Sequence, residues 1–413
     1  MSEAALLLTG GQVLDADGTR FRRCDIRIRG AAIDALAEHI ARRPGERVLA
    51  ADGLFLLPGL IDAHVHAIGV QDDLATLHRV PPYLVAAKAG RVLAGMLARG
   101  FTSVRDAGGA DGSLAECVGT GLFAGPRLFP SGRGLAPPGA QGDFRAAGEA
   151  DLGCPCCGGT RSITRLASGV AALRAAVRAE IAAGATQIKV MASGGIASPA
   201  GPEAPQYAPE ELDAVVDEAA RAGRGVLAHA YGAAAIRRCV EAGVRSIEHG
   251  SGLDAPTADL MARRGTVLVP TLVVFDRIAT GGGPLADTAK RIFDESCRSI
   301  ALARACGVAI AHGSDLEGAA HAHQSDELRL KAAEMPLHEV IASATQVGAG
   351  LIGMGDRLGR LVPGAIADLI GLDADPLAGI APLARPDRHL LIIIKDGTVM
   401  HDRRPAARSG APT

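Results

Sequence analysis

The sequence predicts an α/β protein: a (β/α)8 barrel of the TIM type, with further β-rich segments at both ends of the chain. The middle of the chain alternates short apolar runs with helical segments, which is typical of parallel βα units. Eight such runs can be counted, and eight is the number of strands in a closed barrel of this type. The segments before and after this region predict strands and contain no amphipathic helix.

The elements are expected in the following order. Short strands and turns extend to about residue 58, and β-rich stretches return at 359–373 and 389–404. The barrel strands are predicted at residues 59–66, 101–108, 127–132, 187–195, 225–232, 246–251, 266–272 and 308–315. The clearest helices are predicted at 172–184 and 208–223, and in the second Pro209 suits the first turn. We therefore expect a barrel at residues 59–357 and a smaller unit formed by residues 1–58 and 358–413.

One connection, from about residue 132 to residue 164, is long and rich in Gly, Pro and Cys. It follows the third predicted strand, so it would lie on the barrel face where such enzymes build active sites. A substrate lid and a boundary or disordered insert are both open interpretations. Cys154, Cys156 and Cys157 lie in this connection. They could hold a structural zinc, but a reduced loop is the simpler alternative because paired CxxC motifs are absent.

The bulk composition excludes several classes of function. Acidic and basic residues nearly cancel, at 45 and 43, which gives no electrostatic reason to expect binding to nucleic acid or an anionic membrane. No apolar run reaches the roughly 20 residues of a membrane span. The first residues carry an acid where a signal peptide needs basic residues. We expect a cytoplasmic protein that acts on a small molecule.

Histidine and aspartate follow several predicted strands at their C-terminal ends. His64 and His66 are two apart on one strand, so both imidazoles can point to the same side. His229, His249 and Asp315 each end a different strand, and parallel strands of a barrel end at one rim. Imidazole and carboxylate are ligands that zinc-like ions prefer. The sequence therefore predicts a metal site at this rim.

Lys189 lies in the middle of an apolar strand, where a charged amine is costly to bury. Nearly all other basic positions are Arg, and the chain contains five lysines in all: Lys88, Lys189, Lys290, Lys331 and Lys395. A desolvated lysine has a lowered pKa, and its free amine can react with carbon dioxide to give a carbamate. We favour this carboxylated lysine, which could bridge two metals, over a buried ion pair with an unseen acid.

The stretches LPGLIDAHVH, IKVMASGG, LAHAYG and IEHG, with the closing SD, resemble the amidohydrolase superfamily. The likeness is to its binuclear branch with a carboxylated lysine, and within it to the prolidase-like and imidazolonepropionase-related members, which include dipeptidases and ochratoxin-type amidases. It extends over essentially the whole chain. It implies that the two ends form one small β-sandwich and that the protein assembles into a homo-oligomer, since relatives often do.

The resemblance also implies roles for the predicted ligands. His64, His66 and Asp315 would hold a buried metal, His229 and His249 an outer one, and carboxylated Lys189 would bridge them. Two divalent ions, with zinc expected, could share a hydroxide as the nucleophile. Asp315 would accept its proton and pass it to the leaving amine. The expected reaction is hydrolysis of a peptide-like or N-acyl amino acid bond.

Three further residues are candidates for substrate contacts. Tyr231 could donate a hydrogen bond to the substrate carbonyl or carboxylate, or could be a wall residue. Arg105 could pair with a substrate carboxylate, although Asp106 and helix ends offer it structural partners. Gln141 stands where many dipeptidase-like relatives have a histidine, in a His-Gly-Asp sequence, which weakens a direct transfer of dipeptidase specificity. His312, His321 and His323 could tune the site, but surface or supporting roles are simpler.

Two alternatives compete with this function. A mononuclear hydrolase of a cyclic amide or amidine, like imidazolonepropionase or the deaminases, would keep the histidines and the aspartate but would not need Lys189. A non-catalytic relative that keeps the barrel as a scaffold would be expected to have lost ligands, and here every ligand position is filled.

Overall fold

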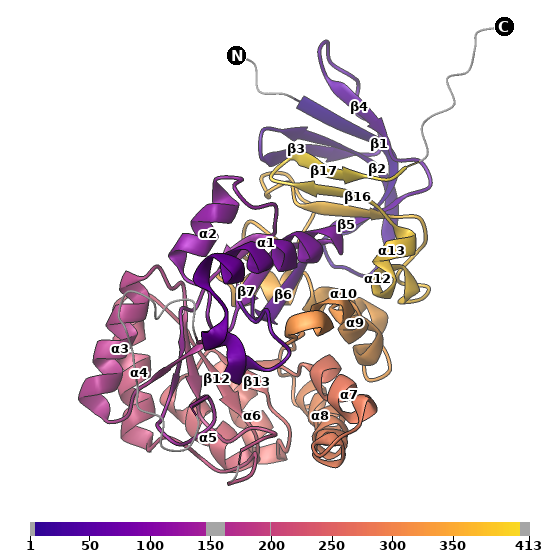
Figure 1. Cartoon of the computed structure of the whole chain (residues 1–413). Coiled ribbons are helices and arrows are strands. Elements are labelled where there is room, and N and C mark those ends of the chain that lie inside the picture. Colours follow the sequence, from indigo (N-terminus) through magenta and orange to yellow (C-terminus); the bar gives the residue numbers. More distant parts are fainter. Residues whose placement is uncertain (1–4, 146–161, 199, 405–413) are drawn as a thin grey trace, which may run out of the picture.

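The computed structural model describes residues 5–145, 162–198 and 200–404, and has two regions (Figure 1). Strands from both ends of the chain lie at one end of the molecule, and α/β units from the middle of the chain fill the other. Within those described residues, no helix combines the length and the apolar character that a membrane span needs. The predicted α/β class with parallel sheets is observed.

The terminal region is one hydrogen-bonded sheet of eight strands. Its strands are β1 (Ala5–Leu14), β2 (Phe21–Arg29), β3 (Ala32–Ala37), β4 (Arg47–Ala50), β5 (Phe55–Pro58), β15 (Leu369–Leu372), β16 (Leu390–Lys395) and β17 (Thr398–Asp402). The order is β17-β16-β15-β5-β1-β2-β3, with β4 paired to β1. β5 joins the two ends of the chain, because it pairs with both β1 and β15.

Two parts of this sheet that are not neighbours in its strand order are connected by a further contact. The edge strand β3 returns to the segment before β15, where Ala32 and Ile366 form an antiparallel bridge. The strands of this sheet contribute a separate apolar cluster that includes the fully buried Leu8, Ile26 and Ile392. One continuous sheet can therefore bury its own apolar face.

The middle of the chain forms two parallel sheets. One contains β6 (Leu60–Val65), β7 (Phe101–Asp106) and β8 (Arg127–Phe129). The other has the order β10-β9-β11-β12-β13-β14, with β9 (Gly134–Ala136), β10 (Thr164–Leu166), β11 (Ile188–Met191), β12 (Val226–Ala230), β13 (Ser246–His249) and β14 (Val267–Val269). Seven of the eight predicted barrel strands are thus present as ladders.

The eighth predicted strand, at 308–315, forms a single bridge between Ile310 and Leu268 of β14. The backbone of Ala63 in β6 also donates to the carbonyl of His312 at 2.8 Å. This segment therefore lies between the first strand of one parallel sheet and the last strand of the other. The segment ends at Asp315, where φ is 54° and the backbone is no longer extended.

Helices connect these strands. They are η1 (Leu74–Arg79), α1 (Pro82–Ala98), α2 (Gly112–Gly119), α3 (Val170–Ala182), α4 (Pro209–Arg221), α5 (Ala233–Ala242), α6 (Ala255–Arg264), α7 (Leu272–Gly281), α8 (Ala286–Ala305), η3 (Gly318–His323), α9 (Asp326–Lys331), α10 (Leu337–Ser343), α11 (Gln346–Leu351), α12 (Ala381–Ala384) and α13 (Pro386–His389). The two helices that the sequence marked most clearly are α3 and α4. The short α12 and α13 were not expected in the C-terminal stretch.

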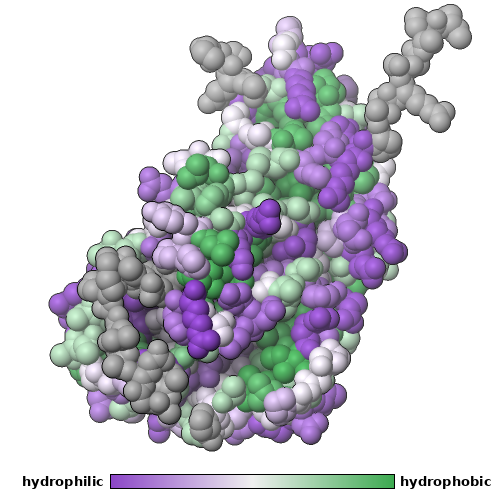
Figure 2. All heavy atoms as spheres, in the orientation of Figure 1, coloured by the Kyte–Doolittle hydropathy of each residue, from purple (hydrophilic) through white to green (hydrophobic). Residues whose placement is uncertain are grey.

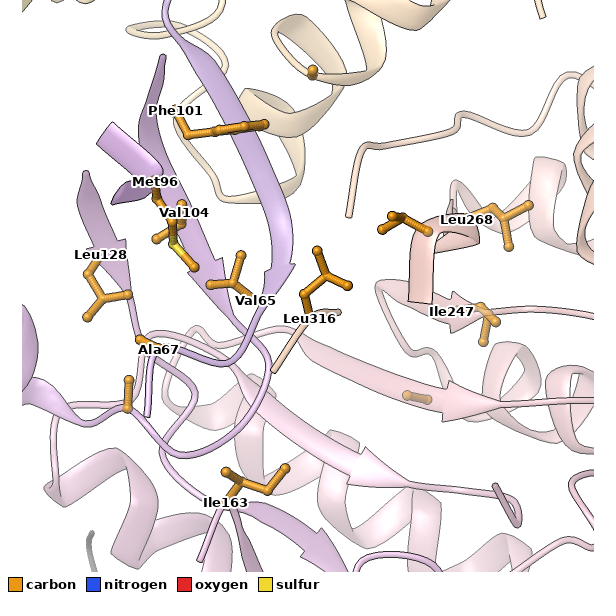
Figure 3. Close-up of a cluster of buried hydrophobic side chains, with 14 of the residues drawn as sticks. Val65, Ala67, Met96, Phe101, Val104, Leu128, Ile163, Ile247, Leu268 and Leu316 are labelled. Atoms are coloured by element: carbon orange, nitrogen blue, oxygen red, sulfur yellow. The ribbon is translucent and has the colours of Figure 1, made fainter. Parts of the chain in front are cut away.

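The main core lies between the parallel strands and their helices (Figure 3). Val65 of β6, Phe101 of β7 and Leu268 of β14 are fully buried there, together with Met96 of α1. Because these side chains come from both parallel sheets, the core ties the sheets together and fixes the strand ends that carry polar residues.

The long connection at 132–164 is not structureless at its ends. Its first part contains β9 and its last part leads into β10, and both strands extend the sheet next to β11. Residues 146–161 lie outside the described residues, and so do the predicted lid role and the cluster Cys154, Cys156 and Cys157.

Candidate metal centre

Three of the predicted ligands meet at the C-terminal ends of their strands. Asp315 Oδ1 lies 3.1 Å from His64 Nε2 and 3.1 Å from His66 Nε2. Ligand atoms of these three residues lie within 4.8 Å of one another, which is close enough to share one ion. Both histidines are buried, and the side chain of Asp315 keeps 17% of its surface exposed. The donor set of two imidazoles and a carboxylate suits a zinc-like ion.

Hydrogen bonds on the far side of each ring aim these imidazoles. His66 Nδ1 donates to the carbonyl of Gly108 at 2.9 Å, and His64 Nδ1 donates to Glu248 Oε2 at 2.7 Å. Each bond fixes the tautomer and leaves Nε2 as the ligand atom. The site is therefore oriented for an ion by its surroundings.

The other two predicted histidines lie beside this group. His249 is 5.2 Å from His64 and 4.6 Å from His229 between ring centroids. His249 Nδ1 is bonded to Thr271 Oγ1 at 2.7 Å, and His229 Nε2 donates to the carbonyl of Gly194 at 2.8 Å. Burial lowers the pKa of His229 to about 3 and that of His249 well below its usual value. Both rings are therefore neutral, the form that binds metals.

Lys189 is almost completely buried on β11, with 1% of its surface exposed. A glycine on the neighbouring strand gives it room, because a Cβ at Gly134 would lie 3.0 Å from Lys189 Cγ. Among the described residues, no carboxylate lies within 4.0 Å of its Nζ. Burial lowers the pKa of Lys189 to about 8, so a neutral amine is accessible near neutral pH.

The backbone is strained at three neighbouring strand ends. His249, Thr271 and Asp315 have φ of 68°, 49° and 54°, in the left-handed region that residues with a Cβ rarely adopt. Such strain costs roughly 1–3 kcal/mol for each residue and is typical of functional sites. Here the strained residues are two predicted ligands, His249 and Asp315, and Thr271, which is hydrogen-bonded to His249.

Sequence reasoning missed the buried carboxylate of Glu248. It accepts from His64 on one oxygen, and on the other from Arg105 Nη2 at 2.8 Å and Ser246 Oγ at 2.5 Å. Burial alone would raise its pKa, but Arg105 and His64 hold the pKa of Glu248 at about 2. Glu248 is therefore an anion, and its bond to Nδ1 orients the ring of His64. Its position next to His249 in the chain was the only available signal.

Arg105 has partners inside the protein. Its Nε donates to the carbonyl of Ala63 at 2.6 Å and its Nη1 to Ser246 Oγ at 3.0 Å, in addition to the bond to Glu248. It is 2% exposed. These bonds favour the structural alternative for Arg105 over the predicted contact with a substrate carboxylate.

Asp62 is a second buried carboxylate that the sequence did not single out. One oxygen accepts from the backbone of His64 at 3.0 Å and of Ser314 at 3.2 Å. The other accepts from Ser314 Oγ at 2.6 Å and Gln324 Nε2 at 2.8 Å. Asp62 therefore joins the strand that carries His64 to the segment that carries Asp315.

Of the two remaining candidates for substrate contacts, Tyr231 touches a predicted ligand and Gln141 does not. The ring of Tyr231 stacks on His249, with centroids 5.1 Å apart and an angle of 3°. Gln141 accepts from Ser198 Oγ at 2.9 Å and packs over Gly195, in the loop after β11. Its described contacts do not join it to the histidines.

The three additional histidines take no part in the His64, His66 and Asp315 group. His312 is buried and stacks on Phe101 at 5.4 Å. His321 Nε2 donates to the carbonyl of Gly69 at 3.0 Å, and His323 Nδ1 lies 3.0 Å from Asp326. These contacts agree with supporting roles.

Comparison with known proteins identifies related enzymes. The model of the amidohydrolase family matches residues 55–400. An ochratoxinase from Aspergillus niger is 33% identical over 350 residues, covering 80% of this chain and 72% of that protein. The crystal structure of a prolidase complexed with N-methylphosphonate-L-proline has a TM-score of 0.93 at 40% identity, covering 97% of this chain and 100% of that chain. A Xaa-Pro dipeptidase structure with bound methionine in the active site gives 0.87 at 30% identity, over 96% and 100%.

Proposed function

Because the chain belongs to the amidohydrolase family, we propose that it hydrolyses an amide bond next to a carboxylate, in a dipeptide or an N-acyl amino acid. Its site would hold two divalent ions, with zinc as the expected metal and carboxylated Lys189 between them. The relatives named as prolidase, Xaa-Pro dipeptidase and ochratoxinase support this choice of bond.

One observation carries the proposal: Lys189 is a buried amine that lacks an ion-pair partner in the described part of the chain, and its charge interacts with His229, His249 and Asp315. An amine in such a position is costly if charged and useful if neutral. As a carbamate, Lys189 would supply two anionic oxygens to the same centre. His64, His66 and Asp315 would hold one ion, and His229 and His249 the other.

The residues of the chain define the remaining chemistry. When bound, divalent ions polarise a carbonyl oxygen and acidify water. Asp315, whose side chain keeps 17% of its surface exposed, would hold the proton that water releases and deliver it to the leaving amine. Tyr231 would orient the substrate, since its ring is fixed against His249. Glu248 and Asp62 would keep His64 and Asp315 in place.

The same proposal includes the architecture around the site. We infer that the parallel strands close into a (β/α)8 barrel at residues 59–357, and that residues 1–58 and 358–413 form the second unit. Backbone bonds from Ala63 to His312 and from Thr186 to Pro130, the latter at 2.7 Å, support closure at the two junctions between the sheets.

A second candidate is hydrolysis of a cyclic amide or amidine with one ion. The observation that favours it is the ligand geometry: within the described residues, only His64, His66 and Asp315 have ligand atoms close enough to form a compact group. This alternative would leave Lys189 without a role at the centre.

A substrate screen with metal analysis tests the proposal. The protein is purified with zinc supplied and is offered dipeptides and N-acyl amino acids that differ in the C-terminal residue, while release of the amine is measured. We expect turnover, about two ions per chain, loss of activity with a chelator and recovery with zinc. Full activity with one tightly bound ion would favour the second candidate. Activity that survives complete metal removal would exclude both.

A further inference from the structure

A hollow of about 530 Å³ lies outside the metal centre, where the two regions of the molecule meet. Its walls come from α1 and the η3–α9 segment on one side and from α12, α13 and the end of β17 on the other. In Figure 1, α9, α12 and α13 lie on one side of the molecule, and α1 runs across its middle. The volume is in the range of small-molecule sites.

Arginine side chains dominate the charge of this hollow. Its lining includes Arg99, Arg385 and Arg403, with Asp326 and Asp387 as the acids. Asp326 lies 3.0 Å from His323, and Asp387 lies 4.0 Å from Arg385. On the face shown in Figure 2, hydrophilic side chains gather over the part where α12 and α13 lie in Figure 1. The hollow therefore has an excess of positive charge.

Arg99 is half-buried without a carboxylate partner in the described chain. Its Nε and Nη2 both donate to Gln324 Oε1, at 3.1 Å and 3.0 Å. No carboxylate among the described residues lies within 4.0 Å of Arg99 or Arg403, whereas many other arginines are paired. Burial lowers the pKa of Arg99 to about 10, so it remains a cation at neutral pH. A guanidinium group that is partly removed from water is stabilised by an anion in direct contact, and the nearby charge of Asp62 reaches Arg99 only through Gln324.

Small side chains leave space around these guanidinium groups. Gly95, Ala98, Ala322 and Ala384 line the hollow. A Cβ at Gly95 would lie 3.2 Å from Arg99 Nη1, so this glycine makes room for the guanidinium group on the surface of α1. The space is thus available to a compact ligand and is not filled by the protein itself.

We propose that this hollow binds a small oxyanion, a carboxylate or a phosphate, between Arg99, Arg403 and Arg385. The flat, forked guanidinium group matches both kinds of oxyanion through paired hydrogen bonds. Arg99 provides the buried contact, and the two more exposed arginines close the other side.

Hydrogen bonds connect this site to the metal centre. Arg99 donates to Gln324, Gln324 donates to Asp62, and Asp62 accepts from the backbone of His64. An anion that draws Arg99 away from Gln324 would change the position of Asp62, and with it the affinity of the centre for metal. Only this coupling rests on the proposed function. The anion site itself is inferred from residues that do not belong to the metal centre.

Binding is tested by titration calorimetry on the full chain after removal of metal, so that the anion cannot bind an active-site ion. Sulfate represents a phosphate-type ligand and acetate a carboxylate, at constant ionic strength. We expect one site per chain, with affinity at least about tenfold weaker in Arg99→Gln and in Arg403→Gln. Arg388→Gln is the matched control, since Arg388 lies on α13 with an exposed side chain and does not line the hollow.

The anion that binds more tightly identifies the natural ligand as a phosphate or a carboxylate. Arg403→Gln keeps the test valid if Arg99→Gln fails to fold, because Arg403 is exposed. The absence of binding to the unmodified chain at tens of millimolar, or equal binding to all variants, would overturn the proposal. Coupling is measured separately, as the zinc affinity in sulfate and in chloride. A shift in the unmodified chain that Arg99→Gln abolishes supports it, and an equal affinity in both salts excludes it.

Discussion

At the scale of single residues, the two most deeply buried lysines of the described chain differ in one respect. Lys331 Nζ donates to the carbonyl of Ala311 at 3.1 Å and to Ser343 Oγ at 2.7 Å. Lys189 Nζ has no hydrogen bond of this kind in the described chain, and its charge interacts with His229 and His249. Both are completely enclosed, so their desolvation is similar. The amine of Lys331 is thus already hydrogen-bonded by the protein, whereas the amine of Lys189 is available to react or to bind.

We expect Lys189→Ala to lose activity by several orders of magnitude, and short carboxylates such as acetate or propionate to restore part of it. The added acid would occupy the space of the carbamate and supply its oxygens. Initial rates with and without the carboxylate, at fixed zinc, measure the effect. Lys189→Arg is expected to stay inactive, because a guanidinium group does not become a neutral nucleophile. Normal turnover in Lys189→Arg would contradict the carbamate.

Lys331→Ala provides the matched control. It removes a buried lysine of the same size, so we expect lower stability and no rescue of activity by carboxylates. Rescue in both variants would mean that the added acid acts through general effects on folding and not at the metal centre.

The sequence singled out the residues that we propose as ligands, but not the groups that hold them. His64, His66, His229, His249 and Asp315 follow apolar strands, and parallel strands end on one side, so their meeting could be predicted. Glu248 and Asp62 could not, because a carboxylate within a strand has no spacing rule that distinguishes a buried anion from an exposed one. Their roles depend on partners more than 100 positions away, as the bonds from Arg105 to Glu248 and from Gln324 to Asp62 show.

At the scale of elements, most barrel strands were predictable, including the three-residue β8 and β14, whereas β9 and β10 were not. α4 has Pro209 in its first turn and an apolar face, so its pattern is clear. β9 and β10 also have three residues each, and no apolar run marks them at the ends of the Gly- and Pro-rich connection. They exist because β9 pairs with the edge of β11 and β10 pairs with β9, which is a tertiary cause.

The position of α9 depends on a buried carboxyl group and predicts an effect of pH. Glu327 Oε2 accepts from the backbone of Val273 in α7 at 2.7 Å, and its other oxygen has no partner in the described chain. Burial raises the pKa of Glu327 to about 7, although nearby Lys331 opposes the shift. The folded state thus favours the protonated acid. Stability from this group is complete below the unfolded pKa, near 4.5, and is lost as the pH rises to about 7.

Glu327→Gln keeps the acceptor for Val273 and removes the ionisation. We expect the variant to gain stability relative to the unmodified chain as the pH rises from 5 to 7.5, measured as the difference in unfolding temperature at each pH. Glu334→Gln, in the turn that follows α9, is the control and should show no such trend. A difference that stays constant with pH would show that Glu327 is not protonated in the folded protein.

At the scale of the whole molecule, Arg127 connects the two regions. It lies on β8, and its Nη1 donates to Ser103 Oγ at 2.9 Å and to Asp368 Oδ2 at 2.9 Å, just before β15. Its Nη2 donates to Asp396, at the turn between β16 and β17. Asp368 has only 2% of its side chain exposed. One guanidinium group thus neutralises a buried acid and an exposed one across the junction.

Arg127→Gln should destabilise the protein, because it leaves Asp368 buried with a weaker partner. Losing a hydrogen-bonded charge of this kind costs about 1.5–3 kcal/mol, which corresponds to a fall of several degrees in unfolding temperature for a chain of this size. Arg23→Gln is the matched control: its pair with Asp52 leaves 64% of each side chain exposed, so we expect a change near zero. Calorimetry of both variants measures the contrast. If Arg127→Gln unfolded at the same temperature as Arg23→Gln, the junction would depend on apolar packing and backbone bonds. The ion pairs of Arg127 with Asp368 and Asp396 would then contribute no measurable stability.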